Sequence, residues 1–156
     1  MRRRALNFRH VSLNGEIRPF PAEYLRFVEL FNLGKYWESH EVLEGAWRRS
    51  KSPFYKGMII YASAFVHAQR GNPRGVAKQL RKAERYLGLY RPYYMGIDVA
   101  RLLSHSSRCM AVVSREEPPC GSDLVEAIPF GRLELDPRLV RGDEPEFDPD
   151  AEAPSG

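Results

Sequence analysis

The sequence predicts an all-α protein, a compact bundle of about five short antiparallel helices arranged as stacked helical hairpins. Apolar residues recur with helical period in five consecutive segments between residues 21 and 113. These segments are separated by glycine, asparagine and proline, which commonly end one helix and begin the next. With 156 residues, of which 43% are hydrophobic and 28% charged, the chain has the composition of one globular domain.

The first two helices are expected over residues 21–32 and 36–49. Pro21 suits the first turn of a helix, and Gly34 suits the turn between the two helices. The second helix has a predicted apolar stripe whose members recur at helical spacing: Tyr36, His40, Leu43 and Trp47.

Three more helices follow. Residues 54–70 are apolar on almost every side, which is typical of a helix at the buried centre of a bundle. The Gly71-Asn72-Pro73 segment ends this helix and begins the next, over residues 73–87, with Asn72 as its N-cap. A tyrosine-rich loop over residues 88–96 then leads to the fifth helix, residues 98–113.

Composition divides the chain into a basic N-terminal arm (1–20), a helical domain (21–116), a proline-rich extended strap (117–141) and an acidic tail (142–156). Residues 127–135 of the strap could form a short strand pair, and the tail is expected to be disordered. Charge follows this division. Residues 1–116 hold 21 Lys and Arg against 9 Asp and Glu, and the remaining residues hold 3 against 11. This asymmetry suggests either a basic surface with an anionic partner or an acidic tail that folds back over the helical domain.

Several function classes lack support in the sequence. The longest charge-free apolar stretch, residues 57–69, is shorter than the roughly 20 residues that cross a bilayer, so we expect no membrane association. Cys109 and Cys120 form no disulfide framework and have no CxxC spacing. No phosphate-binding loop, nucleophile elbow or dinucleotide fingerprint is present. We therefore expect a cytoplasmic protein and predict no cofactor.

A dense polar cluster with flanking tryptophans lies on the second helix. Together with His67 of the third helix, the residues of this cluster are the candidate ligand-binding residues: Trp37, Glu38, His40, Glu41, Glu44, Trp47 and His67. His40 and Glu44 share a helix face, and we expect the imidazole and the acids to face the interior beside the third helix. A buried hydrogen-bonded network is the simplest explanation. The preferred function is a non-enzymatic binding or scaffold protein of unknown partner, with its site between these two helices.

A divalent metal ion is the first alternative for this cluster. His40, Glu44 and His67 could supply one carboxylate and two imidazole ligands from neighbouring helices. The HEVLE segment is similar to the HExxH zinc signature, but Glu44 replaces its second histidine. A hydrolase-like enzyme with Glu41 or Glu44 as general base would use the same residues.

The fourth helix carries a basic face, which suggests a second alternative, a nucleic-acid-binding module. The candidate residues for this site are Arg74, Lys78, Arg81, Arg85, Arg91 and Tyr94. The cations could contact phosphates, and the tyrosine could stack on a base. A solvated helix face is the simpler explanation of the same pattern.

The segment YWESHEVLEGAW, residues 36–47, resembles the signature of the uncharacterised family called domain of unknown function 309. The Gly71-Asn72-Pro73 and Gly96-Ile97-Asp98 segments fit the same family, and the resemblance covers about residues 22–103. It implies a compact, multi-helical, cytoplasmic protein of prokaryotic type, and it implies no reaction. The residues that it transfers form a signature without assigned roles: Glu38, His40, Glu41, Glu44 and Trp47. Ile60 departs from the glutamine expected in many relatives.

Overall fold

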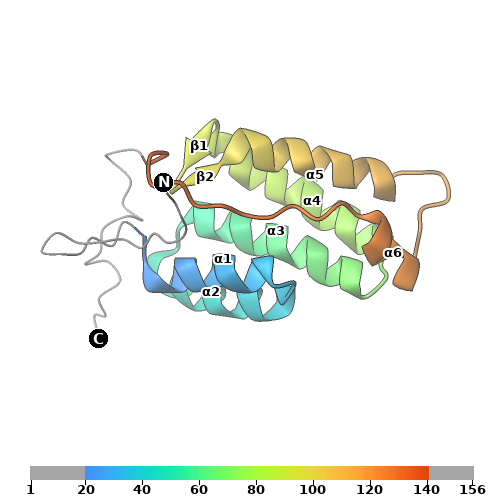
Figure 1. Cartoon of the computed structure of the whole chain (residues 1–156), viewed down its shortest axis with the longest axis horizontal. Helices are drawn as coiled ribbons and strands as arrows, with labels where there is room; N and C mark the ends of the chain where they lie inside the picture. The colour runs from blue at the N-terminus through green and yellow to red at the C-terminus, as the bar shows by residue number, and fades with distance from the viewer. Residues whose placement is uncertain (1–19, 141–156) are drawn as a thin grey trace, which may run out of the picture.

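A computed structural model describes residues 20–140 and confirms the all-α prediction (Figure 1). The described part of the chain contains six α-helices: α1 (Ala22–Asn32), α2 (Tyr36–Ser50), α3 (Pro53–Gln69), α4 (Pro73–Leu87), α5 (Val99–Val113) and α6 (Ser122–Ala127). Between α4 and α5 lie one turn of 3₁₀ helix, η1 (Gly88–Tyr90), and an antiparallel hairpin of two short strands, β1 (Tyr93–Tyr94) and β2 (Ile97–Asp98).

Polar side chains begin three of the helices by accepting a hydrogen bond from a backbone amide of the first turn. As predicted, Asn72 caps α4 and accepts from the Gly75 amide at 3.1 Å. Ser52 caps α3 in the same way, and Asp98 caps α5. The helix boundaries therefore follow from local sequence signals.

Helix α3 lies at the centre of the bundle, as its apolar composition predicts. It packs against α2 on one side and α4 on the other, so the α1–α2 pair and the α4–α5 pair flank it (Figure 1). Gly57 lets α4 approach, because a Cβ at this position would lie 2.6 Å from Leu87.

The α1, α2 and α3 helices meet in a cluster of aromatic rings. The ring of Phe31 lies 4.9 Å from that of Tyr36 and 5.5 Å from that of Phe65, both edge-on, and it stacks on Tyr61 at 5.8 Å. Edge-on and offset contacts of this kind stabilise a core beyond the area that they bury.

The C-terminal region contains one element that was not expected, helix α6. Residues 128–136 form an extended strap, one of the two alternatives predicted for this region, and no strand pair. The described strands lie instead at residues 93–98, where a loop was expected. The strap runs along the bundle from α6 to the hairpin (Figure 1) and buries Ile128, Leu133 and Leu135.

Single contacts, rather than a strand ladder, satisfy the backbone of the strap. The Asn32 amide group donates to the Leu133 carbonyl and accepts from the Leu133 amide, both at 2.8 Å. Near the hairpin, the Asp136 amide donates to the Gly96 carbonyl at 2.9 Å, and the Gly96 amide donates to the Leu139 carbonyl at 3.1 Å.

Buried His105 of α5 holds the other half of the strap. Arg108 donates to Nδ1 of His105 at 3.3 Å, and the imidazole also bonds the backbone of Pro129. Gly131 lies directly against the ring, since a Cβ there would be 2.5 Å from its Nε2 atom. Burial, and then the positive charge of Arg108, lower the pKa of His105.

The expectations for the basic arm and the acidic tail concern residues 1–19 and 141–156, which lie outside the described range. Within the described residues, no helix has both the length and the apolar character needed to cross a membrane.

Replacing Asn32 tests how firmly the strap is held. We expect Asn32→Ala to lower the free energy of unfolding by about 1–3 kcal/mol, because the part-buried Leu133 amide and carbonyl lose their partners. Urea denaturation measures this change. Asn32→Asp keeps the acceptor for the Leu133 amide and should lose less stability, and equal losses in the two variants would contradict the assignment.

Buried His105 predicts a loss of stability in mild acid. Its pKa is lowered in the folded chain, so the unfolded chain binds more protons as the pH falls below the ordinary value of 6.5. We expect the free energy of unfolding to be highest above that pH and to decrease toward pH 5.5 or so in urea titrations. His105→Gln should flatten this dependence. His67→Gln is the comparison variant, because the pKa of His67 is also lowered in the folded chain. It should remove only the contribution of His67 to the pH dependence and leave that of His105.

Candidate functional site

The face of α2 that packs on the core differs from the predicted stripe. The buried residues are Tyr36, Ser39, Leu43 and Ala46, whereas His40 and Trp47 lie at the edge of the contact and are only partly buried. Ser39 is tolerated in the core because its hydroxyl donates to the Tyr36 carbonyl at 2.8 Å. The small residues Ser39 and Ala46 thus lie within the buried face of α2, and the larger side chains of His40 and Trp47 lie at its margin.

His40, Glu41 and Glu44 lie close together at the edge of the buried face of α2. The Nδ1 atom of His40 lies 3.8 Å from Oε2 of Glu41 and 3.9 Å from Oε1 of Glu44, and one ligand atom from each residue lies within 4.8 Å of the others. The same nitrogen is shielded from solvent and has no hydrogen-bond partner among residues 20–140. We call these three residues the α2 cluster.

The α2 cluster is shielded on one side and open on the other. Exposed side-chain fractions are 19% for His40, 31% for Glu44 and 54% for Glu41. The expectation of an inward-facing cluster is therefore wrong for Glu41 and for Glu38, which lies exposed in the first turn of α2, while the His40 imidazole is partly buried and only its Nδ1 atom is shielded from solvent. An acid in that turn interacts favourably with the helix dipole.

Two neighbouring side chains, Trp37 and Arg48, contact the α2 cluster. The Trp37 indole stacks on the His40 imidazole at a centroid distance of 5.3 Å with 8° between the planes. Arg70 lies over the same indole, with its Cζ atom 5.8 Å from the ring centroid. Arg48 approaches the second carboxylate oxygen of Glu44 at 3.8 Å. Trp37 thus covers one face of the imidazole, and Arg48 lies beside one carboxylate oxygen of Glu44.

Chemically, the α2 cluster offers one imidazole nitrogen and two carboxylates around a common point. Separations of 3.8 and 3.9 Å are too long for hydrogen bonds to the buried nitrogen. A cation with ligand bonds of about 2.1 Å would fit between them after small rotations of the two glutamates.

His67 lies outside the α2 cluster, which corrects the predicted trio of His40, Glu44 and His67. Its Nδ1 atom is 3.3 Å from the Asn72 side-chain amide, and a Cβ at Gly75 would lie 2.3 Å from it. The ring therefore faces the first turn of α4. Glu41 takes the third position instead, which helical spacing does not reveal because adjacent residues point in different directions.

Trp47 also has separate surroundings. Its indole packs against the hydrophobic core, and the ammonium groups of Lys51 and Lys56 lie 4.3 and 4.5 Å from its ring centroid. These are cation–π contacts, which give the tryptophan a structural role at the end of α2.

The residues of the predicted nucleic-acid site separate into two groups. Arg74, Lys78, Arg81 and Arg85 are all exposed on α4. Tyr94 is buried against the rings of Phe54 and Tyr90, so it cannot stack on a base. Arg91 lies 3.9 Å from the Glu84 carboxylate, which partly neutralises its charge.

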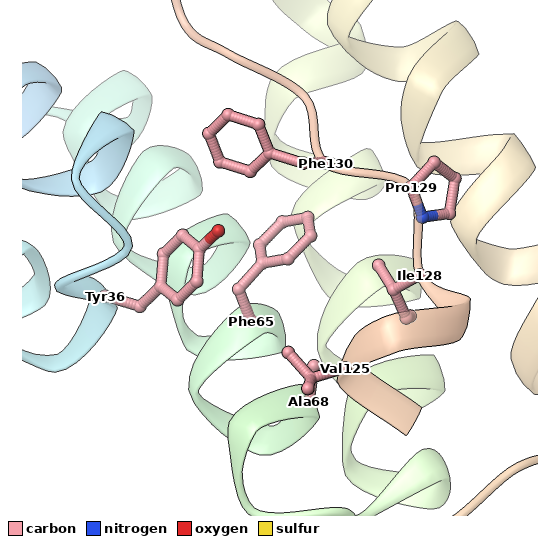
Figure 2. Close-up of a pocket in the computed structure, with 7 residues that line it drawn as sticks. All are labelled: Tyr36, Phe65, Ala68, Val125, Ile128, Pro129 and Phe130. Atoms are coloured by element: carbon pink, nitrogen blue, oxygen red, sulfur yellow. The ribbon is translucent and has the colours of Figure 1, made fainter. Parts of the chain in front are cut away.

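Sequence reasoning missed an apolar pocket between the bundle and the strap (Figure 2). It has a volume of about 120 Å³ and is lined by Tyr36, Phe65, Ala68, Val125, Ile128, Pro129 and Phe130. Burial raises the pKa of Tyr36 to about 12, so its hydroxyl stays protonated at neutral pH. The two walls, residues 36–68 and 125–130, are far apart in sequence, so no local pattern could have indicated the pocket.

Comparison with known families identifies the segment that contains the α2 cluster. Residues 24–79 match the family described as Domain of unknown function (DUF309). This segment belongs to the DUF309 family. The match confirms the resemblance drawn from YWESHEVLEGAW, although it ends before the Gly96-Ile97-Asp98 segment. Comparison with curated proteins gave no match. The DUF309 segment includes the whole α2 cluster and the first half of α4, whereas the strap lies outside it.

Proposed function

We propose that this DUF309 protein binds a divalent transition-metal ion through His40, Glu41 and Glu44. The observation that carries the proposal is the Nδ1 atom of His40, which is buried, lacks a hydrogen-bond partner among the described residues and faces two carboxylates. A buried polar atom without a partner is unfavourable, and a bound cation would satisfy it.

The chemistry of the ligands favours zinc or a similar ion. Imidazole nitrogen suits Zn²⁺, Ni²⁺, Cu²⁺ and Fe²⁺, whereas Mg²⁺ and Ca²⁺ prefer sites made of oxygen alone. Two carboxylates also neutralise the charge of a divalent ion, so the complex carries no net charge at the edge of the core. We therefore expect the α2 cluster to bind Zn²⁺ and to discriminate against Mg²⁺.

The neighbouring side chains support this site without binding the ion. Trp37 stacks on the imidazole and restricts its rotation, while Arg48 lies beside the Glu44 oxygen that does not face His40. Three protein ligands leave a coordination position toward solvent, where Glu41 is exposed. A water molecule or a side chain of a partner would complete the coordination. A site completed by a partner agrees with the predicted function of a binding or scaffold protein. The cytoplasmic location stays a prediction.

Isothermal titration calorimetry with ZnCl₂ on the full chain tests the proposal. We expect one ion to bind per chain, and His40→Ala and Glu44→Gln each to weaken binding by at least about 10-fold, the lower end for loss of a supporting residue. His67→Ala and Glu38→Gln are matched controls, since both residues lie outside the α2 cluster. Absence of Zn²⁺ binding, or unchanged affinity in His40→Ala, would refute the proposal.

Tryptophan fluorescence gives an independent readout of the same site. Because Trp37 stacks on the ligating imidazole, bound Ni²⁺ or Cu²⁺ should quench its emission. We expect Trp37→Phe to remove most of the quenching while calorimetry still detects binding. Trp47→Phe should keep the quenching, because Trp47 contacts Lys51 and Lys56 instead. Equal quenching in both variants would indicate metal bound elsewhere.

A further inference from the structure

We infer that the outer face of α4 binds the phosphate backbone of a nucleic acid without sequence selectivity. This surface, the basic ridge, consists of Arg74, Lys78, Arg81 and Arg85. Their spacing of four, three and four residues places them in one row along the helix. At a rise of about 1.5 Å per residue, the row is about 17 Å long.

Packing on the other side of α4 fixes the direction of the basic ridge. Apolar residues spaced along that side are buried in the core: Val76, Leu80, Ala83 and Leu87. The helix therefore cannot rotate about its axis, and all four cations point to solvent. The four Cα positions are therefore fixed in one row that faces solvent.

The basic ridge lacks the neutralising acids that five arginines outside α4 have. No residue of the ridge forms an ion pair with an acid among residues 20–140. Five other arginines do have such partners: Arg26 with Glu29, Arg48 with Glu44, Arg49 with Glu23, Arg91 with Glu84 and Arg138 with Asp136. Like charges four residues apart destabilise a helix, so the ridge gains most from an anionic partner.

Phosphodiester suits this surface better than a membrane or an acidic protein. The apolar side of α4 is buried, so the helix cannot insert it into a lipid bilayer. Three of the four cations are arginines, whose planar guanidinium groups bind phosphate in a bidentate manner. Since Tyr94 is buried, the contacts are to phosphates and carry no base readout.

Fluorescence anisotropy with a labelled DNA duplex of about 20 base pairs tests the inference on the full chain. Between about 50 and 200 mM KCl, four neutralised phosphates predict a slope of about −3.6 for log K against log[salt]. The variant R74Q/R81Q/R85Q should bind more weakly and make the slope shallower by about 2.7. A duplex of different sequence should bind with the same affinity.

A matched variant separates the basic ridge from net charge. R26Q/R49Q/R138Q removes the same charge from exposed arginines outside α4, and it should keep both the affinity and the slope. Equal weakening in the two triple variants would overturn the inference, as would absence of duplex binding in low salt. Equally tight binding of labelled polyglutamate would also overturn it, because the surface would then favour acidic polypeptides. Circular dichroism melting of each variant confirms that the fold is retained.

Discussion

Burial of α3 on nearly every side is the constraint on which the rest of the structure depends. A central helix with no polar face must be covered by other helices, and α2, α4 and α6 all pack on it. The Phe31, Tyr36, Tyr61 and Phe65 rings fill the space on the α1–α2 side. On the opposite side Gly57 allows the end of α4 to approach. The positions of α2 and α4 follow from this arrangement, and α1 and α5 pack in turn on these two helices.

The same constraint separates the two surfaces that carry function in our proposals. With α3 between them, α2 and α4 each bury an apolar face inward and direct polar side chains outward on different sides of the bundle (Figure 1). His67 illustrates the separation: it lies on α3 but contacts the first turn of α4, so it cannot join His40. The metal and nucleic-acid proposals therefore concern independent surfaces, and the failure of one leaves the other intact.

The strap completes the core by a different means from the helices. Its apolar side chains pack on the bundle, while Asn32, His105 and Gly96 satisfy its backbone one group at a time. The apolar pocket exists because strap and α6 form one wall and α2 and α3 the other (Figure 2). The DUF309 match covers the pocket wall formed by α2 and α3 but not the wall formed by α6 and the strap. It includes the complete α2 cluster. Properties of the pocket thus depend on residues outside the family segment.

The amino-acid sequence by itself indicated the five longer helices, their approximate boundaries and the similarity of residues 24–79 to DUF309. Caps such as Asn72 and the helical period of apolar residues act within a few residues, so they can be read from neighbouring positions. Only the tertiary structure decided that Ser39 rather than His40 enters the core, that Glu41 rather than His67 joins His40, and that Tyr94 is buried. These outcomes depend on which side chains fit between elements distant in sequence, and a local pattern carries no information about that fit.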